Sequence, residues 1–178
     1  FGNISFEDLL QAYFDCRSNK RNTENALKFE LDYEYNLLQL LDEINSGTYN
    51  PGRSIAFIID KPVKREIFAA DFRDRIVHHL IIQKLNPLFE QKFIYDSYSC
   101  RMGKGTHFGI KRIDKFIRRC SNNYSTDCYI LKLDITGFFM HINRVTLYNK
   151  LHNFILINYF YPDKEILLEL CKKVIFKA

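Results

Sequence analysis

The chain has 178 residues, of which 47% are apolar and 26% charged, with a formal net charge of +5. This apolar share is enough to bury a hydrophobic core, and the length suits one domain or two closely packed subdomains. The longest uninterrupted apolar runs are far shorter than a membrane span, and residues 1–15 carry three acidic and no basic side chains, which argues against a secretory signal. We therefore expect no membrane partner and a cytoplasmic location. Because the chain opens on Phe1, we expect it to be a piece of a longer protein.

Apolar spacing and capping signals predict a succession of helices. The first spans residues 5–17, with Ser5 as its N-cap. The second spans residues 23–46, where Thr23 can cap the start and Gly47 supplies the stop. Its leucines at helical spacing are Leu27, Leu31, Leu38 and Leu41. Further helices are expected over residues 72–84, 106–122 and 144–154 and from Pro162 onward, with helical turns at 87–93 and 138–142. The inward faces of the 72–84 helix and the last helix would comprise Ile76, Val77, Leu80 and Ile81, and Ile166, Leu167, Leu170, Val174 and Ile175.

Strand signals fall between these helices. Residues 54–59 and 65–70 can form a hairpin around the basic turn at 61–64, and residues 128–134 read as a buried strand. Residues 95–105 are polar and contain glycine, which is typical of a loop. The predicted fold class is α/β, helix-rich (α+β).

The charges are unevenly distributed along the chain. Residues 1–50 hold 4 basic and 9 acidic side chains (net −5), residues 51–120 hold 15 and 7 (net +8), and residues 121–178 hold 7 and 5 (net +2). A basic middle suggests a polyanionic partner, although a solvated surface of mixed charge would look the same. The five cysteines are scattered without a Cys-x-x-Cys pair, which suits a reducing compartment and gives no zinc site.

Asp134 is the first candidate for chemistry. It closes the apolar run YILKL and is followed by the sharp turn ITGFF. A carboxylate at the end of a buried strand is costly unless it is paired or binds a metal, and this arrangement suits Mg²⁺ with oxygen ligands. The alternative is an aspartate that caps the following turn through a local hydrogen bond.

Two basic segments precede Asp134. Lys61, Lys64 and Arg65 lie at the predicted hairpin turn, where cations could bind a triphosphate, or could simply be exposed. The segment SYSCRMGKGT contains Arg101 and Lys104 and leads into a helix N-terminus, but it lacks the spacing of a P-loop and is a weak phosphate signal.

The order of these segments resembles bacterial reverse transcriptases of the group II intron and diversity-generating retroelement type. Three blocks carry the resemblance: KPVKREIFAADFRDRIVHH, LFEQKFIYDSYSCRMGKGTH and LKLDITGFFMHINR, which begin at Lys61, Leu88 and Leu131. The resemblance covers residues 57–151. It implies a right-hand polymerase fold with fingers (51–125) and a partial palm (126–178). Residues 1–50 and 155–178 match no block and are assigned by position, as an N-terminal helical extension and as continuing palm helices.

The resemblance also implies roles for single residues. Asp134 would be a catalytic metal ligand, and the Ile135 carbonyl would bind the same ion, one of two Mg²⁺ ions in the complete enzyme. Phe139 would exclude a ribose 2′-hydroxyl. The residues expected to bind the deoxynucleotide triphosphate are Lys61 and Arg65, with Lys64 as a third. Those expected to contact nucleic acid are Arg101 and Lys104. The implied partners are an RNA template, a DNA or RNA primer and deoxynucleotides. The oligomeric state stays open.

The sequence departs from the family in one large respect. Family catalysis also needs a Tyr-x-Asp-Asp turn, and no Asp-Asp pair occurs in this chain. We expect truncation before that turn, so that the fragment alone is inactive. The alternatives are an RNA-binding, maturase-like module without polymerase activity, and an α/β domain whose motifs arose by chance.

Overall fold

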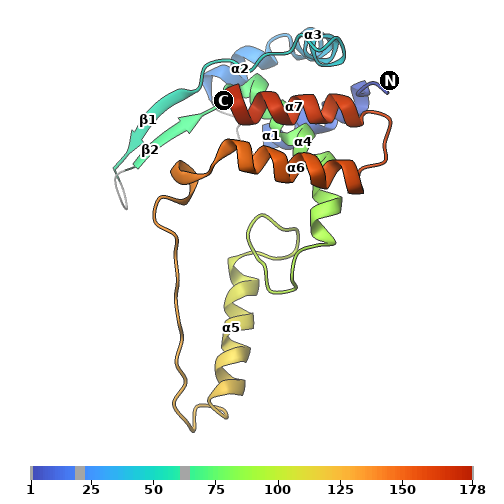
Figure 1. Cartoon of the computed structure of the whole chain (residues 1–178). Coiled ribbons are helices and arrows are strands. Elements are labelled where there is room, and N and C mark those ends of the chain that lie inside the picture. The colour runs from blue at the N-terminus through green and yellow to red at the C-terminus, as the bar shows by residue number, and fades with distance from the viewer. Residues whose placement is uncertain (1, 19–22, 61–64, 178) are drawn as a thin grey trace. The chain divides into compact units, whose positions relative to one another are not determined.

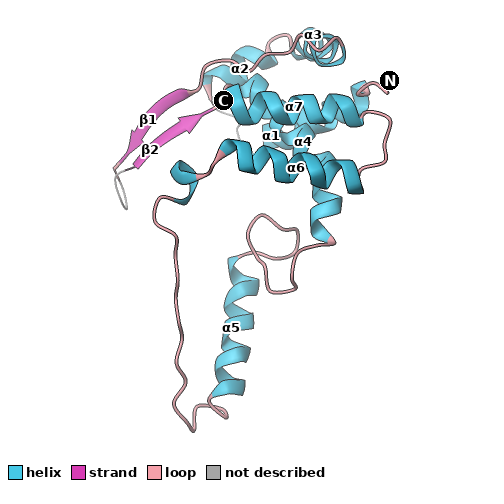
Figure 2. Ribbon diagram, viewed as in Figure 1, coloured by secondary structure: helices cyan, strands magenta, loops and turns pink. Residues whose placement is uncertain are grey.

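The structure, a computed structural model, describes residues 2–18, 23–60 and 65–177 (Figure 1). It divides into two compact units, one formed by residues 1–86 with 143–178 and the other by residues 87–142. Within the described residues the architecture is helix-rich with a single two-stranded antiparallel sheet, which agrees with the predicted α+β class (Figure 2).

The first unit contains most of the helices. In chain order these are α1 (Phe6–Ser18), α2 (Glu24–Glu30), α3 (Tyr33–Asn45), α4 (Phe72–Glu90, whose last turn passes into the second unit), α6 (Arg144–Asn158) and α7 (Lys164–Lys177). Helix α6 packs on α7, and α3 contacts α1, α2 and α7. All of the buried apolar side chains among the described residues belong to this unit. The hydrophobic core predicted from the composition is therefore confined to one part of the chain.

Most of the predicted helices are confirmed, but the one expected over 23–46 is wrong as a single element. The chain breaks at Leu31–Asp32 between α2 and α3, and the leucines expected at one face are mostly exposed. Leu37, Leu40 and Ile44 are buried instead, because α3 turns a different face toward α1 and α7. Gly47 ends α3 with φ of +75°, as its role as a stop requires.

The predicted hairpin is confirmed. Strands β1 (Ile55–Ile59) and β2 (Arg65–Ala69) pair antiparallel, with Ile55 opposite Ala69 and Ile59 opposite Arg65. The expected inward residues of α4 are also buried or nearly so, since Ile76, Val77 and Leu80 are fully inaccessible.

The second unit contains α5 (Thr106–Cys120) and the short 3₁₀ helix η1 (Phe138–His141), joined by a long irregular segment (Figure 2). Helix α5 has no buried residue. This unit is therefore organised by polar and cation–aromatic contacts rather than by a core.

The strand predicted over residues 128–134 is wrong. The segment is extended but belongs to no sheet, and its side chains are exposed: Tyr129 by 91%, Leu131 by 82% and Leu133 by 81%. A strand needs a neighbouring strand for its N–H and C=O groups, and the two strands that the described residues form pair only with each other. Alternating apolar residues therefore do not suffice here.

Candidate functional site

The hairpin predicted to clamp a triphosphate is present, although its turn is not fully described. Lys61 and Lys64 lie outside the described residues, and Arg65 begins β2 opposite Ile59. The apolar side chains of the hairpin are largely exposed, with Phe57 at 45% and Phe68 at 58%. The nucleotide-binding roles of the three cations remain predictions.

A buried carboxylate at the start of α4 anchors the chain that leads into β1. Asp74 is 3% exposed, and its two oxygens accept hydrogen bonds from the Tyr49 hydroxyl (2.8 Å) and the Gly52 N–H (2.7 Å). Burial, and then the neighbouring Asp74 charge, raises the pKa of Tyr49, so its hydroxyl stays a donor. Arg73 adds an ion pair to Glu43 of α3. Sequence reasoning missed this anchor, because no local signal links Asp74 to Tyr49 or Gly52, which lie more than twenty residues earlier in the chain.

Asp134 is exposed at the end of the extended segment. Its Oδ1 accepts a hydrogen bond from the N–H of Ile135 at 2.9 Å, which is the kind of local bond that the capping alternative expects. The other carboxylate oxygen has no protein partner among the described residues, nor does Asp134 form an ion pair there. Asp134 is thus positioned where it could bind a cation from solvent, and one of its oxygens is engaged.

The turn after Asp134 depends on glycine. Gly137 has φ of 61°, in the left-handed region, and a Cβ at this position would lie 2.8 Å from Nδ1 of His141. The turn leads directly into η1, where Phe139 is 84% exposed. Its ring is therefore free to contact a ligand, as the role expected of it requires, and that role stays a prediction.

Arg101 stabilises the loop between α4 and α5 through several hydrogen bonds. Its Nε and Nη2 donate to the carboxylate of Glu90 at 2.8–3.1 Å, and its Nη1 donates to the carbonyls of Ile94 and Ser97. The guanidinium also lies 5.2 Å from the Phe93 ring centroid, and the side chain is only 8% exposed. The hydrogen bond from Arg101 lowers the pKa of Glu90. A template contact by Arg101 remains a prediction, but its donors are already occupied here.

Lys104 is engaged in the same loop. Its ammonium donates to the carbonyl of Tyr95 and lies 4.1 Å from the centroid of that ring. A second arginine–carboxylate pair, which sequence reasoning missed, closes the loop onto α5: Arg112 donates to both oxygens of Asp96 at 2.7 and 2.9 Å. This pairing, together with the Tyr98 hydroxyl, lowers the pKa of Asp96 to about 2. Planar bidentate pairs of this kind fix geometry as well as charge.

Helix α5 carries a row of exposed cations in the second unit. Lys111, Lys115 and Arg119 follow one another at helical spacing, and all three are exposed. Within the described part of the chain, none of them forms an ion pair, whereas Arg118 pairs with Asp114. Helix α5 therefore offers a basic stripe that a polyanion could reach.

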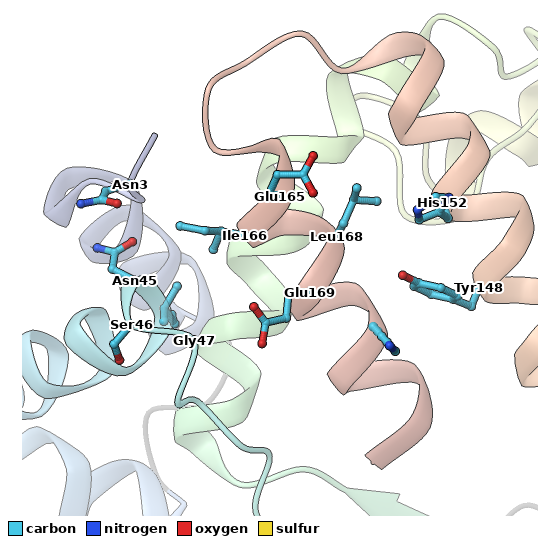
Figure 3. Close-up of a pocket in the computed structure, with 12 residues that line it drawn as sticks. Asn3, Asn45, Ser46, Gly47, Tyr148, His152, Glu165, Ile166, Leu168 and Glu169 are labelled. Atoms are coloured by element: carbon cyan, nitrogen blue, oxygen red, sulfur yellow. The ribbon is translucent and has the colours of Figure 1, made fainter. Parts of the chain in front are cut away.

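A pocket of about 560 Å³ lies in the first unit, between the end of α3 and helices α6 and α7. Figure 3 shows Glu165 and Glu169 of α7 beside it, with Tyr148 and His152 of α6 on another side. Glu169 is paired with Lys173 at 2.7 Å. None of the residues predicted for the site lines this pocket, and we assign it no role in the chemistry.

In the residues that the structure describes, no three histidine, cysteine, aspartate or glutamate side chains cluster closely enough to hold a metal ion. Asp134 and Ile135 offer oxygen atoms, the kind of ligand that Mg²⁺ prefers, but they are too few to complete its coordination. A single carboxylate would need substrate phosphates or further protein ligands beside it. Nor does any helix in the described ranges have the length and apolar character needed to cross a membrane.

Compared with models of known protein families and with curated proteins, the sequence matches none. The functional argument for this chain therefore depends on its own residues and on the three ordered blocks.

Proposed function

We propose that this chain supplies the fingers and the first catalytic aspartate of an RNA-directed DNA polymerase. The observation that carries the proposal is the setting of Asp134: an exposed carboxylate at the end of an extended segment, followed by the left-handed Gly137 turn and the exposed ring of Phe139. The order of the three sequence blocks supports it, as does the hairpin formed by β1 and β2.

Each residue would have a separate task. The hairpin cations Lys61, Lys64 and Arg65 would bind the triphosphate, and Phe139 would exclude a ribose. Asp134, with the Ile135 carbonyl, would hold one of two Mg²⁺ ions. When bound, one ion would activate the primer hydroxyl and the other would stabilise the pyrophosphate leaving group. The chain contains no Asp-Asp pair, so the remaining carboxylates would have to come from a further segment of a longer protein.

The test is primer extension by the protein that carries this sequence together with such a segment. We expect Asp134→Ala to abolish incorporation of deoxynucleotides on an RNA template, while the circular dichroism spectrum stays unchanged. Asp127→Ala is the matched control, because Asp127 is another exposed aspartate of the same irregular segment. Polymerisation by the Asp134→Ala protein at the wild-type rate would refute the assignment.

A second candidate is an RNA-binding, maturase-like module. The basic stripe of α5, formed by Lys111, Lys115 and Arg119, favours it, because binding to RNA needs accessible cations but no metal cluster. The two candidates are not exclusive, since a polymerase must also hold its template.

Filter binding of the 178-residue chain to single-stranded RNA across a salt series tests this second candidate. Each phosphate contact contributes about 0.7 to the slope of log K against log salt, so replacing all three stripe cations by alanine should lower the slope by roughly 2. Replacing three exposed cations of the first unit, Lys28, Lys150 and Lys172, serves as the control. An equal loss in both triple variants would show that the stripe is not a specific contact surface.

A further inference from the structure

The loop that follows α5 has an unusual backbone conformation. Asn122, Asn123 and Tyr124 have φ of 45°, 60° and 70°, so three consecutive residues with side chains lie in the left-handed region. Such a conformation is strained, and it persists only where the surroundings hold it. The loop must therefore be fixed by bonds that offset this strain.

Those bonds are visible on both sides of the loop. The Asn123 N–H donates to the Arg118 carbonyl at 2.7 Å, and the Tyr124 N–H donates to Oγ of Ser121 at 2.8 Å. The Tyr124 hydroxyl reaches back to Asp114 at 2.9 Å, where Arg118 pairs with the same carboxylate. The strained residues are thus bound to the last two turns of α5.

The end of the loop is folded back onto its beginning. The carbonyl of Ser121, a residue only 2% exposed, accepts hydrogen bonds from the N–H groups of Ser125 at 2.9 Å and Thr126 at 3.0 Å. Cys120 directly precedes this closed turn, and Cys128 follows it by two residues. Cys120 and Cys128 thus lie on the two flanks of a turn that the Ser121 carbonyl closes, and the Cys120 side chain, ahead of burial, raises the pKa of Cys128. The fold therefore brings together two cysteines that are separated by seven residues in the sequence.

We propose that Cys120 and Cys128 are a redox site that closes into a reversible intramolecular disulfide. The site stands independently of the proposed polymerase function. Both sulfur atoms are accessible, because Cys120 is exposed and Cys128 partly exposed, whereas Cys16 and Cys171 are buried. Cys100 is also exposed but lies in a different loop.

The oxidant is a low-molecular-weight disulfide such as glutathione disulfide. The Cys120 thiolate attacks one sulfur of glutathione disulfide, forming a mixed disulfide and releasing one glutathione thiolate. The Cys128 thiolate then attacks the Cys120 sulfur and releases the second. Two protein thiols lose two electrons, one glutathione disulfide is reduced to two glutathione thiols, and the two thiol protons pass to the released thiolates. Cys120 is the first nucleophile because it is the more exposed of the pair and because the pKa of the Cys128 thiol is raised.

The consequence is a covalent link between the end of α5 and the segment that leads to Asp134. Closing the link would fix the start of that segment, which in the reduced chain belongs to no sheet. Oxidation would then restrict the motion of residues 128–134 without touching the carboxylate itself.

The experiment equilibrates the 178-residue chain in glutathione buffers of graded composition, with and without urea. After acid quenching and alkylation, peptide mapping by mass spectrometry gives the fraction of each cysteine as thiol, mixed disulfide or Cys120–Cys128 disulfide. We expect the folded chain to be half-oxidised at a glutathione composition at least about tenfold more reducing than the urea-unfolded chain requires, because the native loop holds the two sulfurs together.

Single variants identify the pair. Cys120→Ser and Cys128→Ser should each abolish the intramolecular species and leave a glutathione mixed disulfide on the remaining cysteine, while Cys100→Ser should leave the disulfide intact. Equal oxidation of folded and unfolded chains would overturn the proposal, as would glutathione mixed disulfides at Cys120 and Cys128 of the wild-type chain in place of the cross-link.

Discussion

Lys84 offers the sharpest test of how the helices of the first unit are held together. Its ammonium lies 2.8 Å from a carboxylate oxygen of Asp8 in α1 and 2.8 Å from one of Asp163, immediately before α7. The Lys84 side chain is 13% exposed and that of Asp163 is 8% exposed, whereas that of Asp8 is 38% exposed. Asp163 also accepts a hydrogen bond from the Tyr159 hydroxyl at 2.9 Å. One cation therefore joins three helices, and its two partners differ in burial.

The expected magnitudes follow from that difference. Lys84→Met keeps most of the apolar stem but leaves the Asp163 carboxylate buried and without its cation, which costs about 3 kcal/mol. Asp8→Asn removes only a partly exposed charge and should cost less than about 1 kcal/mol. In the double variant Lys84→Met/Asp163→Asn no buried charge is left unpaired, so most of the loss should be recovered.

The charge state of Lys84 sets the pH window. Burial alone would lower its pKa, but the hydrogen bonds to Asp163 and Asp8 outweigh burial and raise it. A raised pKa means that the stabilisation is complete below the unfolded-state value of about 10.4 and is lost as the pH rises through the folded-state value. At neutral pH the effect is therefore fully present.

Urea unfolding followed by circular dichroism at pH 7 measures these differences, and the Lys84→Met variant should also melt roughly 6–12 °C lower. Two results would refute the reasoning. The first is a free energy of unfolding for Lys84→Met within about 1 kcal/mol of the wild type, which is no more than an exposed ion pair contributes. The second is an Asp8→Asn protein as unstable as Lys84→Met.

Two further predictions concern the anchor at Asp74 and the pair formed by Asp96 and Arg112. Asp74→Asn should destabilise the chain by about 2 kcal/mol in urea unfolding, because one amide cannot accept hydrogen bonds from both the Tyr49 hydroxyl and the Gly52 N–H. The control is Asp71→Asn, where asparagine can still cap α4, and it should change stability by under about 0.5 kcal/mol. Equal losses in the two variants would contradict the anchor. Arg112→Gln should raise the pKa of Asp96 from about 2 toward the ordinary value of about 3.9, as measured by carboxyl NMR titration. In the wild-type chain the pair therefore stabilises the loop fully at a pH above about 3.9, and this stabilisation is lost as the pH falls through about 2. An unchanged Asp96 titration in the variant would contradict the pairing.

Local signals predicted much of the fold because they act over a few residues. The hairpin, the inward face of α4 and the stop at Gly47 depend on strand-forming residues, helical spacing and a left-handed glycine, all of which can be identified in the sequence. The break between α2 and α3 could not be predicted in this way, because Leu31 and Asp32 carry no strong helix-breaking signal. Packing of α3 against α1 and α7 decides which leucines are buried there.

The candidate site was harder to predict, since its contacts join residues far apart in the sequence or depend on a partner strand. Residues 128–134 have the composition of a buried strand, yet pairing is a property of two segments and not of one. Similarly, the five cysteines looked scattered because spacing alone does not show that a closed turn places Cys120 and Cys128 on its two flanks. Asp134 was found because a carboxylate after an apolar run is unusual whether or not that run pairs.

The arginines of the second unit show why residue type alone does not assign a nucleic-acid contact. Arg101 and Arg112 each hold a carboxylate by two or more hydrogen bonds, and together they stabilise a unit that has no buried apolar side chain among its described residues. An arginine used in this way cannot release its partner for a phosphate without leaving that carboxylate unpaired. Within the described part of the chain, Lys111, Lys115 and Arg119 of the α5 stripe form no ion pair, so binding a phosphate would leave no carboxylate unpaired. A polyanion would therefore engage α5 first, while Arg101 and Arg112 keep the neighbouring loop in shape.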